Sequence, residues 1–539
     1  GTLSVKAISD TDAQAEAVSL AFTQSESESN NVSAAVAFNV ALLDASAYLG
    51  NGTTNAGSVA VEAGTTAGQM NEFKALALSG AGSQQSSKGG GTSGGTDAGN
   101  TGNTNGGQGT GGDKSSLGIA GAVAFTVYGS PATDDPNTVK ATIADGADVT
   151  ASTGDVAVTA RQDIGMQNIA GGAALTISSS GGGGGGGGGS SDTTVGAAVT
   201  IGVADYDTLA QIGSGAKVDA AGDVNVSVAS SLKPLEIITP IVKEVETGLD
   251  VTSLAIGAAI GSGGNAGAGS ATINVISPTT RASIGAGADV DAGGDVSVRA
   301  TSDVRMVDVA GALGITIGTG KESGSGVGIG LNVGVHTATT EAVIEGGTVI
   351  APTTIDADGN VIVETDSSDE FFQLAVNAGA GASTSGAGSL NVLVNITHTR
   401  ALVNDDLNDA TTGVATIVSE GSVEVAAVSR TDIESYAGSL GASLSESAVG
   451  ISVGVVIDVD DTLALVGDGT EVTALGQGDA IDVASGDFDG SGNSIDTTAR
   501  GLAVTATSHD DIFMLAIAAS ASLGQDNQGQ TGADGGGGS

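Results

Sequence analysis

A short phrase, glycine followed by residues that place valine at alternate positions, recurs along the chain and constrains its fold more than any other feature. Its three strongest copies begin at Gly154, Gly222 and Gly294, each reading Gly-Asp-Val-x-Val. Weaker copies complete a series of starts near residues 1, 57, 154, 222, 294, 359, 421 and 501. Such repetition indicates a chain built by stacking similar units rather than by folding around one centre. We therefore expect one continuous array over residues 1–539.

Each unit reads as three parts. The opening phrase has a period of two and predicts a strand. Two arms rich in Ala, Gly and Val follow, separated by a Gly/Ser-rich middle; in the unit from Gly294 they span 309–317 and 327–335. A closing Thr-x-Ala-x-Ile/Val phrase, as at 280–284 and 399–403, ends the unit.

Valine or isoleucine then recurs every six residues, as at Ile284, Val290 and Val296. Short strands at this spacing, with Gly, Ala and Asp between them, indicate the flat sides and corners of a parallel β-solenoid. The sequence thus predicts an all-β, elongated, repetitive β-solenoid, or parallel β-helix. The two arms could instead pair as hairpins, which would give an antiparallel or mixed β-rod. An irregular insertion, with a helix as one option, is expected from Leu235 to Leu249.

Gly/Ser-rich tracts interrupt the units and cannot bury enough apolar surface to order themselves. We expect them to leave one edge of the solenoid as loops. They lie near residues 79–114, 178–191, 261–270, 318–326 and 522–539.

Composition narrows the classes of function. Glycine makes up 90 of 539 residues, aromatic residues only 2%, and there is no cysteine or tryptophan, so the core must be thin and holds no disulfide. The net charge of −45 repels nucleic acids and anionic membranes. No apolar run reaches the length of a membrane helix. Because the chain opens on a repeat phrase and ends in a Gly-rich stretch, we expect a segment of a longer or processed polypeptide.

The sharpest local motif lies between residues 487 and 496, where oxygen donors stand at the alternate positions 487, 489, 491 and 493. Donors in this spacing match the start of a calcium loop, with Gly492 allowing the turn, although Thr498 stands where a bidentate glutamate would close it. The metal ligands that we predict for Ca2+ are Asp487, Asp489, Ser491, Asn493 and Asp496. The alternative is a solvated acidic turn.

Other polar residues predict less chemistry. The repeated Asp155, Asp223 and Asp295 could form a ladder that binds cations, but we favour turn residues that cap backbone groups. The histidines His336, His398 and His509 show no metal spacing. No nucleophile elbow, lysine-bearing phosphate loop or zinc signature is present. We therefore expect no catalytic residues, no organic cofactor and no enzyme activity.

The stretch from Ile284 to Val296, Ile-Gly-Ala-Gly-Ala-Asp-Val-Asp-Ala-Gly-Gly-Asp-Val, and its copies resemble those of very large repetitive bacterial surface proteins. The groups it resembles are filamentous-haemagglutinin-like adhesins and autotransporter passengers. The 60- to 70-residue unit with its Gly-rich middle departs from the shorter repeats of filamentous haemagglutinins. This resemblance implies export, an elongated rod, and a role in adhesion or in a surface fibre or matrix.

Together these features predict a secreted or cell-surface structural protein that forms a fibre, stalk or matrix by stacking β-repeats. Its partners would be further copies of itself or neighbouring repeats of a longer chain. The alternative is an adhesin that presents a binding surface on the rod to a host, a neighbouring cell or a glycan. A polysaccharide-active enzyme is a remote alternative, because fold alone does not fix function.

Overall fold

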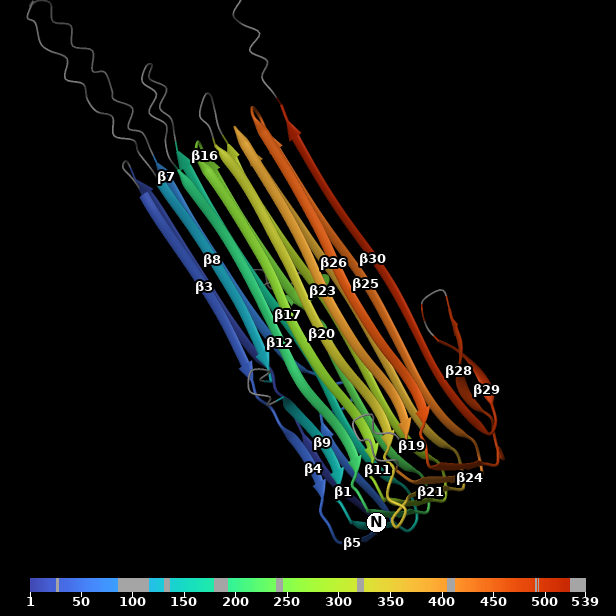
Figure 1. The fold of residues 1–539 in the computed structure, drawn as a ribbon. Helices are drawn as coiled ribbons and strands as arrows, with labels where there is room; N and C mark the ends of the chain where they lie inside the picture. The colour runs from blue at the N-terminus through green and yellow to red at the C-terminus, as the bar shows by residue number, and fades with distance from the viewer. Residues whose placement is uncertain are drawn as a thin grey trace, which may run out of the picture.

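The computed structural model describes residues 1–25, 29–85, 116–129, 136–178, 192–238, 246–317, 324–404, 413–489, 492 and 494–523. Every regular element in these ranges is a β-strand. The strands form three long parallel sheets, here named A, B and C, so the predicted parallel β-solenoid is confirmed (Figure 1). One turn of the solenoid, a rung, runs through sheet A, then sheet B, then sheet C.

Sheet A begins each rung. Its main path holds β1 (Thr2–Ile8), β6 (Ser58–Gly64), β11 (Val156–Ser178), β14 (Val224–Ile238), β19 (Val296–Ile317), β22 (Val361–Gly381), β25 (Val423–Ser443) and β30 (Leu502–Ser522). Beside this path lie β2 (Ala13–Ser25), β7 (Asn71–Gln85), β15 (Glu246–Val251) and β16 (Ser253–Ser262). The eight opening phrases are the first residues of the eight main-path strands, which pair in chain order.

Sheet B carries the chain back, and sheet C closes the rung. Sheet B holds β3 (Ser29–Ala41), β8 (Ser116–Tyr128), β12 (Thr193–Ile212), β17 (Asn265–Ile284), β20 (Ser325–Ile344), β23 (Thr384–Val403) and β26 (Ser447–Val466), with β4 (Ala45–Leu49) and β9 (Asn137–Ile143) beside them. Sheet C holds β5 (Thr53–Ala56), β10 (Asp148–Ala151), β13 (Lys217–Ala220), β18 (Asp289–Ala292), β21 (Thr353–Ala357), β24 (Ala415–Ser419) and β27 (Thr470–Ala474).

The two arms of a unit do not pair with each other. The arms 309–317 and 327–335 lie in β19 and β20, which belong to sheets A and B. Each arm pairs in parallel with the same arm of the next rung. The antiparallel alternative for the arms is therefore wrong, because the arms pack face to face instead of sharing backbone hydrogen bonds.

The insertion expected at Leu235 to Leu249 is extended, not helical, where the structure describes it. There β14 leaves sheet A and pairs antiparallel with β15, and β16 then resumes the rung between β11 and β19. The stretch near 261–270 that we expect as an insertion is also mostly strand, because β16 ends at Ser262 and β17 begins at Asn265. Close packing accounts for Gly264 of this stretch, because a Cβ there would overlap the backbone oxygen of Asp192.

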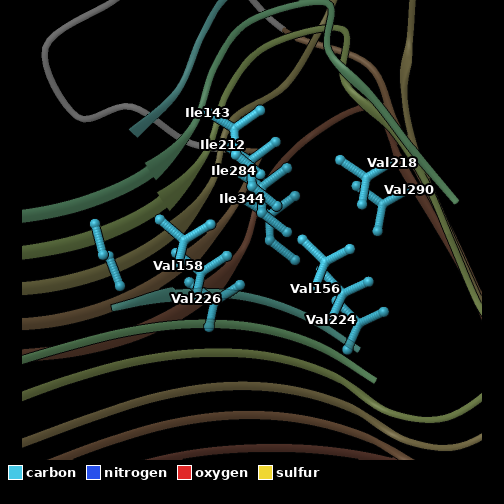
Figure 2. Close-up of a cluster of buried hydrophobic side chains, with 14 of the residues drawn as sticks. Ile143, Val156, Val158, Ile212, Val218, Val224, Val226, Ile284, Val290 and Ile344 are labelled. Atoms are coloured by element: carbon cyan, nitrogen blue, oxygen red, sulfur yellow. The ribbon is translucent and has the colours of Figure 1, made fainter. Parts of the chain in front are cut away.

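At one end of each rung the three sheets enclose a triangular interior, here named the proximal core. Figure 2 shows its aliphatic side chains in columns, one of them formed by Ile143, Ile212, Ile284 and Ile344. The six-residue spacing has a simple origin, because Ile284, Val290 and Val296 lie on three successive strands, in sheets B, C and then A of the next rung. All three are fully or almost fully buried.

Beyond sheet C only sheets A and B face each other, and this part is here named the distal blade. Its interior narrows outward. Next to the proximal core it holds larger residues, including Phe73, Met166 and Tyr206, and then mainly alanines. Towards its outer end it holds glycine: a Cβ on Gly196 would overlap the backbone oxygen of Ala258 in the facing sheet. The taper explains the near absence of aromatic bulk.

Candidate functional site

The strongest departure from the repeat is an antiparallel hairpin of β28 (Ile481–Phe488) and β29 (Ser494–Ala499). It lies between β27 and β30 in the chain and packs beside β25 and β30 (Figure 1). Ile481 and Val483 are buried, whereas Asp482 and Asp496 are exposed. The hairpin thus covers part of the outer face of sheet A and leaves two polar clefts beside it.

The first cleft encloses about 390 Å³ between the hairpin and sheet A. Charged residues dominate its lining: Arg299, Glu364, Asp366, Glu424, Arg430, Asp482 and Asp496. Two ion pairs order the floor, one joining Arg299 Nε to Glu364 Oε2 at 2.8 Å and one joining Arg430 Nη2 to Asp366 Oδ1 at 2.6 Å. Each pair links neighbouring rungs, because its partners come from β19, β22 and β25.

Glu424 is the most perturbed acid of this cleft. Only 5% of the residue is exposed. Burial raises its pKa to about 7, the negative charge of Glu364 adds to the rise, and Arg299 opposes it. A carboxyl group of this kind changes charge near neutral pH, so the cleft floor is pH-sensitive. Perturbed acids of this type occur both at binding sites and in structural charge networks.

The second cleft, of about 520 Å³, lies on the same face and is lined mainly by acids, together with His509 and Arg430. Glu370, Asp432, Asp489 and Asp511 contribute carboxylates, and the ring of His509 stacks on Phe488 with centroids 4.7 Å apart. Burial and the neighbouring Asp511 raise the pKa of Asp432. A cation or a hydroxyl-rich ligand fits the chemistry of this lining better than an anion does.

The predicted calcium ligands belong to the stretch of sequence from the end of β28 to the start of β29. Ser491 and Asn493 lie outside the described residues. Asp487 is exposed, Asp489 lines the second cleft and Asp496 lines the first. Within the part of the chain that the structure describes, no three acidic or histidine side chains form a group that could hold a metal ion. The calcium site remains a prediction.

The repeated aspartates form a ladder at the corner between sheets C and A. Oδ1 of Asp155 accepts the backbone N–H of Asp223 at 3.0 Å, and Oδ1 of Asp223 accepts that of Asp295 at 2.9 Å. The next rungs continue with Asn360 as donor to Asp295, and Ser422 as donor to Asn360. These residues cap backbone groups of the neighbouring rung, which is the interpretation we favoured.

Two of the three histidines belong to internal networks. His336 is fully buried, its Nδ1 lies 2.8 Å from Oδ1 of Asn395, and it lies 3.9 Å from Asp369. His398 lies 3.4 Å from Asp461, which also pairs with Arg400. Neither histidine lines any of the pockets described here. Only His509 lines one, and no sequence spacing pointed to it.

Sequence reasoning missed the first cleft, although part of its signal was visible. Arg299, Glu364 and Arg430 stand a few residues after the opening phrases of three units, at positions that share one sheet face. That register would have placed opposite charges on adjacent strands. The fold of the hairpin back over this face could not be read from its acidic sequence.

Comparison with known proteins gives no relative: no protein-family model, no curated protein and no solved structure matches this chain. The resemblance to giant surface proteins is therefore supported only at the level of the parallel β-solenoid. The described ranges also contain no helix long and apolar enough to span a membrane.

Proposed function

We propose that this chain is an extracellular structural protein of a bacterial surface, in which stacked β-rungs form a fibre, stalk or matrix. One observation carries the proposal: rung follows rung in parallel register through the three sheets, with the sheet edges open. In sheet B, the outermost described strands β3 and β26 each pair on one side only. An open edge of this kind is a template for another rung.

The outermost rungs support the same function. Leu20 and Phe22 of β2 are 82% and 69% exposed, and Ile451 of β26 is 58% exposed. Further rungs, from this chain or another copy, would bury part of this surface and pair the free backbone groups. The Asp ladder and the ion pairs between rungs stabilise the same direction of growth. Export and a surface location rest on the resemblance and on composition.

The hairpin clefts favour a second candidate, an adhesin. They form an irregular surface on a mainly repetitive rod, and their carboxylates could accept hydrogen bonds from glycan hydroxyl groups. In this case the solenoid is the stalk and the hairpin is the binding element. A host or neighbouring cell would supply the ligand.

Calcium belongs to either proposal as a bound ion at the hairpin tip. Oxygen donors at alternate positions from Asp487 to Asn493 support it. Its binding would fix the hairpin tip next to the second cleft.

Electron microscopy of the purified chain, with calcium and then with a chelator, tests the proposed function. A fibre-forming protein gives long filaments with the 4.8 Å strand spacing along the axis. Short rods of constant length in both conditions, together with saturable glycan binding, would instead establish the adhesin. Filaments that dissolve in chelator would place calcium in the assembly.

A further inference from the structure

The outer face of sheet B in the distal blade is apolar without interruption. On every strand from β3 to β26, five successive outward positions carry only Val, Ile, Leu, Phe, Ala or Gly. On β20 these positions are Val327, Ile329, Leu331, Val333 and Val335, and the buried residues alternate with them. The pairing registers align the five positions across the sheet. We name this surface the B face.

The interior behind the B face is the more polar side. On β20 the residues facing inward include Asn332 and His336, both fully buried. Asn332 accepts a hydrogen bond from Thr272 and donates one to Asn391. The strand therefore directs its large aliphatic side chains away from the solenoid and its amides into it. Apolar residues on the outside of a sheet indicate that something else covers that face.

Glycines on the B face give a second, independent observation. Inward glycines are required by the facing sheet, since a Cβ on Gly326 would overlap the backbone oxygen of Ala380. Outward Gly267, Gly269 and Gly388 differ, because a Cβ there would meet nothing within 4 Å. None of them has a positive φ angle. Glycine inside a strand is unfavourable, and it marks a place where another backbone or a ligand approaches closely.

These glycines shape the face into ridges and grooves. Gly267 of β17 lies between Val195 of β12 and Val327 of β20, and Gly386 of β23 lies between Val327 and Val449 of β26. In the row of Val195 and Gly267, large residues and glycine alternate from β12 to β26, and in the next row they alternate from β17 to β26. A surface with the same strand spacing can place its ridges in these grooves, and a second copy of the B face has that spacing.

We propose that the B face is the contact surface of a dimer, in which two copies of this chain pack B face to B face. Strand spacings give the face an area of roughly 1,000 Å². Stable interfaces bury about 800 Å² on each partner, so the face is large enough. An isologous pair buries the same patch on both copies, and sheets of this kind pack about 10 Å apart. This pairing concerns the flank of the stack and goes beyond the proposed axial growth.

Charge is consistent with this partner. The chain carries a net charge of −45, yet the B face contributes no titratable side chain. Two copies thus meet through an uncharged face, with their acids elsewhere. Added salt should tighten the dimer by screening the remaining repulsion. A lipid surface would also cover aliphatic side chains, but fluid acyl chains need no glycine grooves.

The test is sedimentation velocity of the purified chain over a range of concentrations and salt. Val333→Lys places a charge at the centre of the B face and should weaken the dimer at least tenfold. Leu313→Lys is the matched control: Leu313 points outward from sheet A of the same blade and is 39% exposed. It should leave the dimer unchanged. Gly388→Leu fills a groove at a position where an added Cβ meets nothing within 4 Å of its own chain, and it should also weaken the dimer.

Circular dichroism shows whether each variant keeps its β content, and Val333→Thr serves if Val333→Lys fails to fold. A wild-type chain that stays monomeric, or a dimer that survives all B-face changes, overturns the proposal. Binding of monomeric chains to phosphatidylcholine vesicles through the B face overturns it as well. Axial growth is distinguishable, because it lengthens particles in micrographs, whereas flank pairing doubles their width and is lost in Val333→Lys.

Discussion

The proximal core and the distal blade belong to the same rungs, but their aliphatic side chains point in opposite directions. In the proximal core Val226 and Ile212 point inward and are completely buried. In the distal blade the aliphatic side chains Val333 and Leu313 point outward, and glycine, alanine and amides fill the interior. The first region is held by hydrophobic burial within one chain. The second has too narrow an interior for that, so its apolar surface is available for contacts between molecules.

The largest effect is expected where the blade is narrowest. Gly196→Val would drive a side chain into the backbone of Ala258, which cannot rotate away. We expect a destabilisation of about 3 kcal/mol or more, because overpacking against backbone forces the sheets apart. Gly267→Val is the matched control on the next strand, since its Cβ meets nothing within 4 Å. Urea unfolding followed by circular dichroism measures both, and equal loss in the two variants would contradict the account.

Truncation of an isoleucine should strongly reduce stability in the proximal core but not on the B face. Ile212→Ala removes a buried side chain from one of the columns in Figure 2 and should cost about 3 kcal/mol through the lost burial and the cavity left behind. Ile201→Ala, on the same strand but on the B face, should change the stability of the monomer by less than about 1 kcal/mol. Hydrogen exchange measured by mass spectrometry can locate each effect along the stack. A larger loss for Ile201→Ala would reverse the comparison.

The polar interior of the blade predicts a pH dependence. Asp308 is fully buried and accepts a hydrogen bond from Asn274, and burial raises its pKa to about 7. The folded state then keeps a proton that the unfolded state loses above about pH 4. The stability from this group is complete below pH 4 and is lost as the pH rises through 7.

Asp308→Asn imitates the protonated acid and removes this dependence. Between pH 5 and pH 8 the free energy of unfolding of the wild type should fall by about 2.5 kcal/mol relative to that of the variant. This follows from a difference of about three between the folded and unfolded pKa of Asp308. Urea midpoints at the two pH values measure the difference. A parallel pH dependence in both proteins would show that Asp308 is ionised in the folded state.

The smallest effect concerns the Asp ladder at the corner between sheets C and A. Asp223→Ala removes the acceptor of the Asp295 N–H and should cost about 1 kcal/mol. Asp223→Asn should be close to wild type, because Asn360 already fills this role two rungs further along. Faster exchange of the Asp295 amide in Asp223→Ala alone is the expected result; faster exchange in both variants would mean that the charge is essential.

The sequence predicted the proximal core well for a physical reason. Ile284, Val290 and Val296 lie on successive strands in three different sheets, so their six-residue spacing follows directly from the geometry of the corners. Alternation also gave the strands of the blade. Alternation could not show which side of a blade strand faces inward. Val333 looks like a core residue in the sequence, and only the narrow interior of the blade, which holds Asn332, places Val333 outside.

The two clefts could not be predicted from local sequence patterns, because they form between segments that are far apart in the sequence. Glu424 and Arg299 meet under the hairpin only because β28 folds back over sheet A, and no residue of the acidic insertion specifies that contact by itself. The predicted calcium ligands were found from spacing alone, and their spacing remains the support for them.

Because the chain contains no cysteine, single cysteines can report directly which side of a strand faces solvent. The most direct test compares maleimide labelling of Leu313→Cys and Ala312→Cys in the blade with Ser227→Cys and Val226→Cys in the proximal core. The account predicts rapid labelling of Leu313→Cys and Ser227→Cys, and labelling of the other two only after unfolding. Protection of Leu313→Cys with rapid labelling of Ala312→Cys would mean that the blade faces the other way, since a shift of one residue exchanges the two faces.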